Sequence, residues 1–355
     1  MATLTGDGSA VGSTATQVRF EHSRDFPDLL SHLGVSVVVS TYQAGKVLVL
    51  SSRQGKLAIT FHNFEQPMGM AIRPGCLAIG TRRAVYYLHS AHDLAPRIDP
   101  PGQYDGAFLT RRSHFTGTIH CHDLAWCGDE LWVTNTLFSC LCTLRPEYHF
   151  VPGWRPPFIS GLAPQDRCHL NGLAADTEKP RYVTVLAQTD IPEGWRPNKA
   201  KTGCILEVPS GKVVTNGLCM PHSPRLYGGN LWVLNSGLGN LSLVDVSTGK
   251  LDEVAQVPGY TRGLAFHGRF AFVGLSRIRE TNVFGGLPIA EKRDDLVCGV
   301  GVIEWATGRT VATFMLRSGV EEIYDVQVIP VRHLAISGPH PDIDGSPVIW
   351  VVPPA

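Results

Sequence analysis

Short apolar runs alternate with glycine, proline and polar turns along almost the whole chain. One phrase recurs in these runs with small changes: Gly-Met-Ala-Ile at 69–72, Asp-Leu-Ala-Trp at 123–126, Gly-Leu-Ala-Ala at 172–175 and Gly-Leu-Ala-Phe at 263–266. A second apolar run follows each phrase after a few residues. Strand-like units that repeat about every 50 residues are typical of a β-propeller, so the pattern predicts an all-β propeller.

The number of blades follows from the number of innermost strands. Looser copies of the phrase begin at Ser223 and Asp325, which brings the innermost strands to six. Residues 28–31 occupy the spacing expected of a seventh copy in a degenerate form. We therefore expect seven blades, with six as the alternative. The three strands that need this seventh inner partner lie at 35–40, 46–51 and 57–62.

The two ends of the chain are expected to close the ring. Residues 347–352 form a third strand that lacks a fourth, and residues 17–22 supply it from the other end of the chain. The only segment with helical periodicity is DFPDLLSHL at 25–33.

Composition excludes two classes of partner. Thirty-one basic and 31 acidic residues leave no net charge to attract nucleic acid or an anionic membrane. No run of 18 apolar residues offers a membrane span. Residues 1–16 are small and polar, which predicts a disordered tail before a single domain at 17–355.

Cysteine usage and the expected architecture bear on location and assembly. Nine cysteines without a CxxC pair, in a chain without a secretion signal, predict reduced and buried thiols in a cytoplasmic protein. A closed propeller leaves little free sheet edge, so a monomer is expected.

Histidines gather where the repeats begin. Aligned copies place one residue directly before each phrase and another three positions before it, and both point the same way on an extended chain. Four of the 14 histidines occupy these positions. The directly preceding set is Met68, His122, Asn171, His222, Arg262 and Tyr324, and the other set is Gln66, His120, His169, Met220, Tyr260 and Glu322.

This grouping predicts a metal site at the channel mouth. Neutral imidazoles suit Fe, Cu or Zn, so His120, His122, His169 and His222 are the candidate ligands. Glu322 would act as a ligand or general base, and His120 and Tyr324 join it as candidate catalytic groups. The alternative is that these histidines are hydrogen-bonded channel residues or contacts to a substrate.

Polar residues after the second strand of each blade belong to the same mouth, and arginines among them suit an anionic substrate. Two long insertions, 190–202 and 277–296, fall beside it, and the second is expected to form a lid with an apolar tip. The candidate substrate-binding residues are Arg82, Asn135, Asn171, Asn235, Arg262, Arg277 and His340.

Several catalytic motifs are missing from the sequence. There is no GxSxG, no GxxxxGK[ST], no GxGxxG opening a helix and no HExxH. Cys121 lies between two histidines, but strand alternation is expected to turn it into the blade core and away from the channel.

Several stretches resemble a known family. FPDLLSHLGVSVVVSTYQAGKVLVL, FHNFEQPMGMA, IHCHDLAW, CHLNGLA, MPHSPRLYGGNLWVLNSG and GYTRGLAF look like an uncharacterised family of bacterial proteins, a domain of unknown function found mainly in proteobacteria and cyanobacteria. The resemblance covers nearly the whole chain from about residue 20 and implies a propeller-like fold. It implies no activity and no catalytic residues. The architecture is also similar to iron carotenoid oxygenases and selenium-binding-protein thiol oxidases, an analogy of fold that transfers no function.

Two functions remain open. The first is a metal-dependent enzyme that acts on a small, anionic molecule, with oxidation favoured and hydrolase or lyase chemistry as alternatives; a metal-free variant uses the histidines as acid and base. The second is a scaffold that binds a peptide or protein through rim aromatics such as Tyr42, Trp195 and Phe284. The histidine grouping favours the enzyme.

Overall fold

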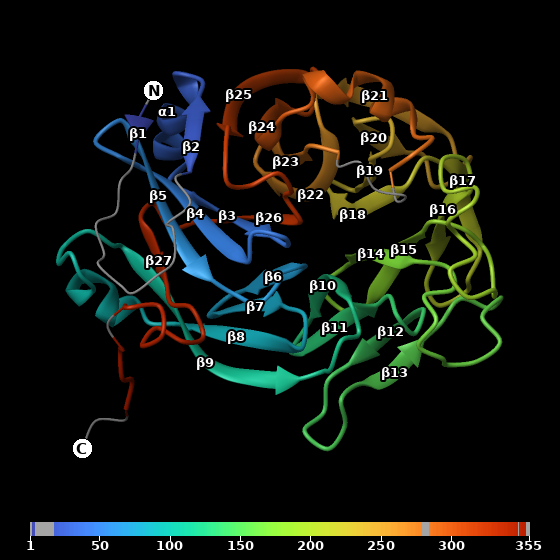
Figure 1. The fold of residues 1–355 in the computed structure, drawn as a ribbon, viewed down its shortest axis with the longest axis horizontal. Helices are drawn as coiled ribbons and strands as arrows, with labels where there is room; N and C mark the ends of the chain where they lie inside the picture. The colour runs from blue at the N-terminus through green and yellow to red at the C-terminus, as the bar shows by residue number, and fades with distance from the viewer. Residues whose placement is uncertain (1, 4–17, 279–283, 347, 353–355) are drawn as a thin grey trace.

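The computed structural model describes residues 2–3, 18–278, 284–346 and 348–352. Over these residues the strands form six sheets, which are arranged as blades around a central axis (Figure 1). The all-β propeller is therefore confirmed, with six blades instead of the seven expected. The innermost strands are β6 (Met70–Arg73), β10 (Cys121–Cys127), β14 (Leu170–Ala175), β18 (Pro221–Tyr227), β22 (Tyr260–His267) and β26 (Asp325–Ile329).

Three consecutive blades are four-stranded antiparallel meanders that run from the axis outward. Their strands are short, and several are buried along nearly their whole length because the two faces of a blade pack on the two neighbouring blades. The outer strands are β11 (Glu130–Asn135), β12 (Cys140–Thr143) and β13 (Val151–Trp154); β15 (Pro180–Val185), β16 (Gly203–Glu207) and β17 (Val213–Leu218); β19 (Asn230–Asn235), β20 (Asn240–Val244) and β21 (Leu251–Gln256).

Residues 28–31 do not form the expected seventh inner strand. They lie inside helix α1 (Asp25–Leu33), whose Phe26 and Leu30 are fully buried in the way of an amphipathic helix. The three strands that were expected to need a seventh inner strand instead have β26 as their inner neighbour, and Asp325 on β26 pairs with Ser40. One blade thus joins a late strand to three early ones, which are β3 (Ser36–Thr41), β4 (Lys46–Arg53) and β5 (Lys56–Asn63).

The terminal strands do not pair as expected either. The strand β2 (Arg19–His22) lies beside β25, with Phe20 opposite Leu316, and residues 348–352 are not in a strand; Gln17 and Pro347 fall outside the described residues. This blade contains β23 (Phe270–Ser276), β24 (Cys298–Glu304), β25 (Arg309–Leu316), β2 and the short β1 (Ala2–Thr3). The remaining blade contains β7 (Cys76–Gly80), β8 (Ala84–Ser90), β9 (Gly106–Phe115) and the parallel β27 (Leu334–Ile336).

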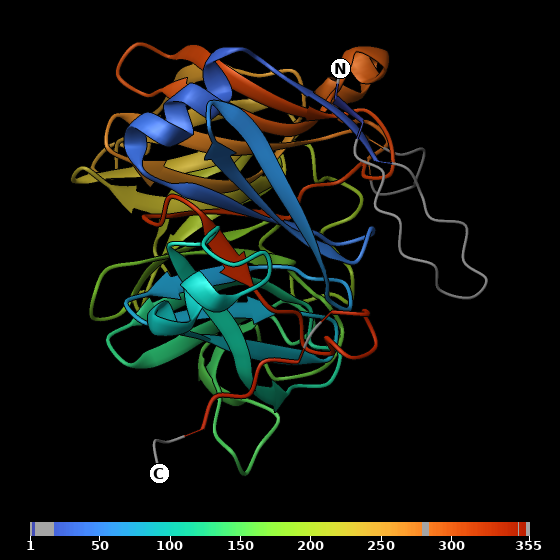
Figure 2. The same cartoon turned by 90° about the vertical axis from the view of Figure 1, so that its left-hand side faces the viewer.

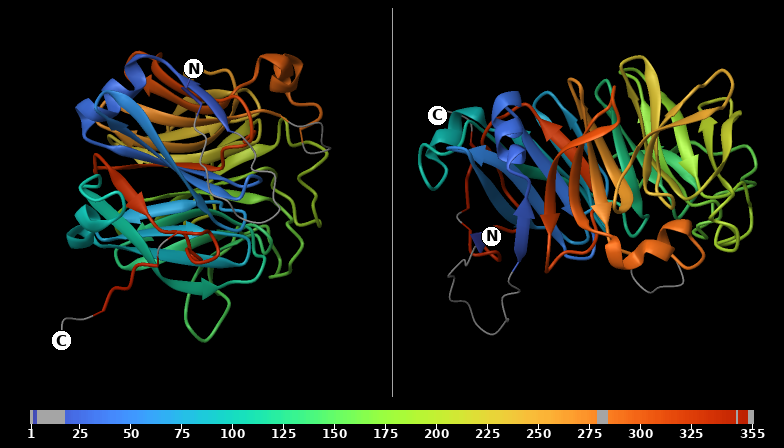
Figure 3. Two further views of the ribbon diagram at one scale, coloured as in Figure 1. Left: turned by 60° about the vertical axis from the view of Figure 1, so that its left-hand side comes forward. Right: turned by 90° about the horizontal axis from the view of Figure 1, so that it is seen from above.

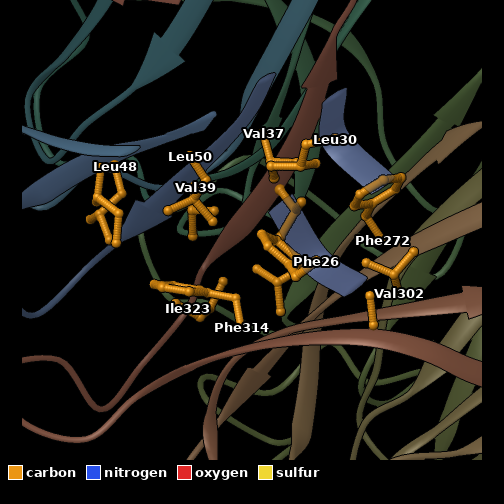
Figure 4. Packing of buried hydrophobic residues seen from close by; sticks show 14 of the residues in the cluster. Phe26, Leu30, Val37, Val39, Leu48, Leu50, Phe272, Val302, Phe314 and Ile323 are labelled. Atoms are coloured by element: carbon orange, nitrogen blue, oxygen red, sulfur yellow. The ribbon is translucent and has the colours of Figure 1, made fainter. Parts of the chain in front are cut away.

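Helices mark the two faces of the ring. Helix α1 packs Phe26 and Leu30 against Phe272 and Phe314 between two blades (Figure 4). It lies on one face, and the 3-10 segment η2 (Pro288–Asp295) lies on the opposite face (Figures 2 and 3). A second 3-10 segment, η1 (His92–Arg97), precedes β9.

A buried ionic belt ties the innermost strands together. The Arg225 guanidinium on β18 binds both oxygens of Asp123 on β10, at 2.7 and 3.2 Å, and lies 3.5 Å from Asp325 on β26. Asp325 accepts the Met70 amide of β6, and Asp123 accepts the Leu173 amide of β14. Arg225 also donates to the Leu264 carbonyl of β22, so one cluster reaches all six inner strands. Burial raises the pKa of the Asp325 carboxyl to about 7, although Arg225 opposes this shift.

The cysteines behave as the sequence predicts. All nine are free and buried. Burial raises the pKa of the Cys121 thiol to about 12, so this side chain is a poor nucleophile at neutral pH. No helix among the described residues is long and apolar enough to cross a membrane.

Candidate functional site

The predicted histidines meet at the mouth of the channel where the inner strands begin. The ring centroids of His122 and His169, on neighbouring blades, lie 4.8 Å apart, and those of His120 and His122 lie 6.4 Å apart. The charges of His169 and His222 both act on the pKa of His122, so His222 belongs to the same electrostatic cluster.

Hydrogen bonds fix the orientation of His122. The Thr136 hydroxyl lies 2.9 Å from His122 Nδ1 and gives its single proton to the Leu170 carbonyl at 2.6 Å. It can therefore only accept from the imidazole, which places the ring proton on Nδ1. Consequently Nε2 of His122 carries a lone pair and no proton.

His222 is held in the same way one hundred residues later. Its Nδ1 lies 2.9 Å from the Met220 carbonyl, which can only accept, and 3.0 Å from the hydroxyl of Ser236. Ser236 follows Asn235 as Thr136 follows Asn135, so the repeat supplies a hydroxyl to each imidazole. The proton again belongs on Nδ1 and leaves Nε2 free.

His169 has a carboxylate partner instead. Its Nδ1 lies 2.8 and 3.0 Å from the two oxygens of Asp166. The indole Nε1 of Trp195 donates to Asp166 at 3.2 Å, and the indole ring packs 4.4 Å from the imidazole. A carboxylate on Nδ1 fixes the tautomer and stabilises a positive imidazole if Nε2 takes a proton.

The backbone contributes to this orientation through unusual conformations. Gln66, His120, His169 and Met220, which share one repeat position, all have positive φ between 48° and 57°. Non-glycine residues adopt this region at a cost of about 1–3 kcal/mol. At Met220 the strained residue is the one whose carbonyl receives the imidazole proton of His222. The same repeat position therefore has a strained backbone in four repeats, and in one of them this backbone orients an imidazole.

Three of the imidazoles are neutral at physiological pH. Burial, and then the charges of His169 and Arg262, lower the pKa of His122 well below its usual range. Burial and Arg262 do the same to the pKa of His222. Burial also lowers the pKa of His120, although Asp166 opposes this shift. Neutral rings with a free Nε2 can accept a proton or ligate a metal.

Tyr324 and Arg262 form the wall beside His122. The Arg262 guanidinium stacks 3.3 Å from the Tyr324 ring centroid and lies 3.4 Å from Glu322. Tyr324 packs 5.4 Å from His122, and its hydroxyl is buried without a hydrogen-bond partner among the described residues. Burial raises the pKa of Tyr324 well above its usual range, so the hydroxyl stays protonated and can donate.

The other predicted binding residues divide into two groups. Arg82 is exposed. Burial raises the pKa of Tyr42 and lowers the pKa of His120, and the charge of Arg82 also acts on both groups, which places it at the mouth. Asn171 is buried beside the site, with Nδ2 unpartnered among the described residues.

Asn135 and Asn235 instead serve the fold. Each is buried, and each side-chain oxygen accepts a backbone amide, from Phe138 and from Cys219 respectively. Arg277 is half-buried, and its amide bonds to the backbone of Glu321. His340 is exposed, and its carbonyl accepts the amides of residues 343 and 344 in a surface turn, so it serves a turn and not the imidazole cluster.

Described residues of both insertions contact the mouth. Residues 190–202 place Trp195 on His169, and the segment that begins at Phe284 packs on Tyr260, which contacts His222. They share one apolar cluster that includes Trp195, Met220, Tyr260, Leu287 and Ile289. We name this cluster the roof. Residues 279–283 of the expected lid lie outside the described residues.

Within the described residues, no group of three or more His, Cys, Asp or Glu side chains is placed to hold a metal ion. The four histidines therefore do not form a metal centre that is already assembled. His122 and His169 are the imidazole pair with the shortest ring separation described above.

Sequence reasoning missed three residues of the site and gave a fourth the wrong environment. Thr136 and Ser236 follow the repeated second strand, so the repeat carried a signal for them. Asp166 has no counterpart in the other repeats. Trp195 was expected as an exposed rim aromatic and is in fact 2% exposed.

Comparisons with known proteins give a family and no chemistry. A family model described as Domain of unknown function (DUF4915) matches residues 24–336. No curated protein matches the sequence. Among solved structures, the chain is similar to one in a nidogen/laminin complex, at 10% identity and a TM-score of 0.48, over 84% of this chain and 100% of that one. It is also similar to selenomethionine-substituted virginiamycin B lyase from Staphylococcus aureus, at 11% identity and a TM-score of 0.40, over 78% of this chain and 74% of that one. Similarities this distant carry no information about function.

Proposed function

The chain belongs to the DUF4915 family, whose description names no activity, and we propose that its channel mouth is the active site of an enzyme that moves protons on a small, anionic molecule. His169, held by Asp166, is the general base. Its Nε2 takes a proton from the substrate, and the resulting imidazolium is stabilised by the carboxylate. Lyase and isomerase reactions share this step, whereas in a hydrolase the same base would take the proton from water.

One observation carries the proposal. His122, His169 and His222, on three neighbouring blades, each direct Nδ1 to a protein acceptor, so in the neutral form of each ring Nε2 is the nitrogen without a proton. A structural histidine needs only to satisfy its ring nitrogens, and a set that leaves the same nitrogen free in three consecutive repeats is suited to chemistry.

The surroundings support a small substrate with a negative charge. Arg82 is exposed at the mouth, and Arg262 stands beside His122 with its charge only partly balanced by Glu322 at 3.4 Å. The Tyr324 hydroxyl stays protonated next to the imidazoles, so it can donate a hydrogen bond to negative charge on the substrate without losing its proton.

A second candidate is a transition-metal enzyme, with oxidation as its favoured reaction. Ring centroids 4.8 Å apart and free Nε2 atoms make His122 and His169 the pair that would hold Fe, Cu or Zn. Acceptors on Nδ1, including Asp166, are the partners that metal-ligating histidines usually have. Glu322 or His120 would complete the ligands only after rearrangement, because no three such groups among the described residues are suitably placed.

The experiment measures proton transfer and does not require the natural product to be identified. Chelator-treated protein in D2O is incubated with a panel of small carboxylic acids that bear an acidic C–H bond, and deuterium incorporation is followed by NMR. His169 that removes a proton exchanges it with solvent and returns deuterium. The His169→Gln variant is expected to lower the exchange rate by about 10²–10⁴-fold. The matched control is His267→Gln. His267 is the last residue of β22, at the end of the strand away from Tyr260 and the mouth, so this variant should leave the rate unchanged.

The outcomes separate the candidates. Exchange that persists after chelation and disappears in His169→Gln supports the acid–base enzyme. Exchange or oxidation that appears only after Fe, Cu or Zn is added supports the metal enzyme. Equal rates for wild type and His169→Gln on every compound, both after chelation and after Fe, Cu or Zn is added, would contradict both and leave the peptide-binding scaffold.

A further inference from the structure

We infer that the 190–202 insertion is a functional part of the active site: through Trp195 it holds the Asp166 carboxylate, and thereby sets the orientation of the proposed base His169. This deepens the proposed function and rests on it. Trp195 is a positioning residue, because it touches the base and its carboxylate and not the reacting atoms.

The Asp166 carboxylate is shared between two donors. His169 Nδ1 lies 2.8 Å from Oδ2, and Trp195 Nε1 donates to the same oxygen at 3.2 Å. A carboxylate held by one donor can rotate about its side-chain bonds, whereas two donors from different directions restrict it. The indole bond therefore fixes the acceptor to which the imidazole must align.

The indole also restricts the imidazole by direct packing. The ring of Trp195 lies 4.4 Å from the ring of His169 at an angle of 41°, and the Arg196 guanidinium lies 4.6 Å from the indole centroid. Glu193 holds Arg196 by two hydrogen bonds, at 2.9 and 3.0 Å. The insertion thus stacks Arg196 on Trp195, and Trp195 on the proposed base His169.

The insertion is anchored around this contact. Arg167 binds Asp190 at 2.6 Å, the Glu193 amide donates to the Gln165 carbonyl, and the Met220 amide donates to the Lys199 carbonyl. Trp195 itself is 2% exposed. Asp166 adopts a strained φ of 45°, so the chain keeps an unfavourable backbone conformation at the residue that joins the insertion to the base.

The consequence is a defined tautomer. With Asp166 fixed, the neutral ring of His169 keeps its proton on Nδ1, which leaves Nε2 as the unprotonated nitrogen. If the carboxylate loses its indole donor, it can leave the imidazole plane, and the Nε2–H tautomer becomes accessible. That tautomer cannot accept a proton at Nε2, so the base would be present but wrongly protonated.

The inference can be tested by ¹⁵N NMR of full-length protein with labelled histidine, without substrate or metal. The ¹⁵N shifts show which ring nitrogen of His169 carries the proton. Wild type is expected to show a protonated Nδ1 and an unprotonated Nε2. Trp195→Phe keeps the ring and removes the donor, and is expected to shift the tautomer ratio about five-fold. Asp166→Asn, which removes the charge, should shift it about ten-fold or more. Trp154→Phe is the matched control, because it removes an indole bond of 2.9 Å to the Pro209 carbonyl away from the site.

A shift in Trp195→Phe and none in Trp154→Phe, with both variants folded by circular dichroism, supports the inference. An unchanged Nδ1–H tautomer in folded Trp195→Phe would overturn it, even if stability fell, because a merely structural tryptophan would lower stability alone. The readout needs no turnover. A tautomer that follows Trp195 in a protein without deuterium exchange would therefore uphold this inference while the proposed function fails.

Discussion

Replacement of Arg225 by methionine is expected to destabilise the protein by about 3–5 kcal/mol, because it leaves two buried carboxylates without their shared cation. Asp123 and Asp325 are 3% exposed each, and both depend on the guanidinium between them. Methionine preserves most of the side-chain volume, so the loss reports the missing charge and hydrogen bonds.

The effect should exceed that of an ordinary ion pair because Arg225 joins strands from different blades. It donates to the carbonyls of Leu173 and Leu264, so its removal also takes a hydrogen-bond donor from buried backbone on two inner strands. An unpaired buried acceptor costs about 1–3 kcal/mol.

Unfolding by denaturant measures this loss. Arg181→Met, which breaks an ion pair of 2.9 Å between partly exposed side chains, is the matched control and is expected to cost less than about 1 kcal/mol. Similar losses in the two variants would show that the belt does not hold the inner strands together.

The second large effect is a loss of stability in acid that arises from His122 and His222. The folded protein keeps both rings neutral to a pH well below 6.5, whereas the unfolded chain protonates them near 6.5. Below pH 6.5 the unfolded state therefore binds more protons than the folded state, and stability falls as pH falls. Each histidine contributes about 1.4 kcal/mol per pH unit until its folded-state pKa is reached.

The contribution of His222 can be isolated with His222→Asn, because the asparagine amide can still donate near the position of Nδ1. The free energy of unfolding is measured from pH 7 to 4.5 in wild type and variant. The wild-type curve should be steeper by about 1.4 kcal/mol per pH unit. Asp325 acts with the opposite sign, because its raised pKa adds stability that is lost as pH rises toward 7, but it is common to both proteins. Parallel curves for wild type and His222→Asn would contradict the claim that His222 is buried in its neutral form. As a control, His32→Asn, at the exposed end of α1, should give a curve parallel to wild type.

The repeat explains why the inner strands and the histidines were predictable. Each copy of the phrase marks the same strand, so His122, His169 and His222 could be placed at one mouth from the sequence alone. The blade count failed because spacing alone suggested a strand at 28–31, where the apolar period of Phe26 and Leu30 favours a helix.

Features without a counterpart in the repeat could not be predicted. Asp166 and Trp195 lie outside the repeated phrases and meet His169 only through the path of the 190–202 insertion. Arg225 lies inside a single inner strand, and nothing in its sequence context indicates two carboxylates from distant blades. The tautomers depend on which neighbour can only accept a proton, which is a property of three-dimensional contacts.

The proposed enzyme depends on three imidazoles that present a bare Nε2 to one site. A ¹⁵N NMR experiment on wild-type protein at pH 7 can establish this, since the protonated and unprotonated ring nitrogens have well-separated shifts. We expect His122, His169 and His222 each to carry a proton on Nδ1 and none on Nε2. Protonation of Nε2 in His122 or His222 would contradict the proposed arrangement.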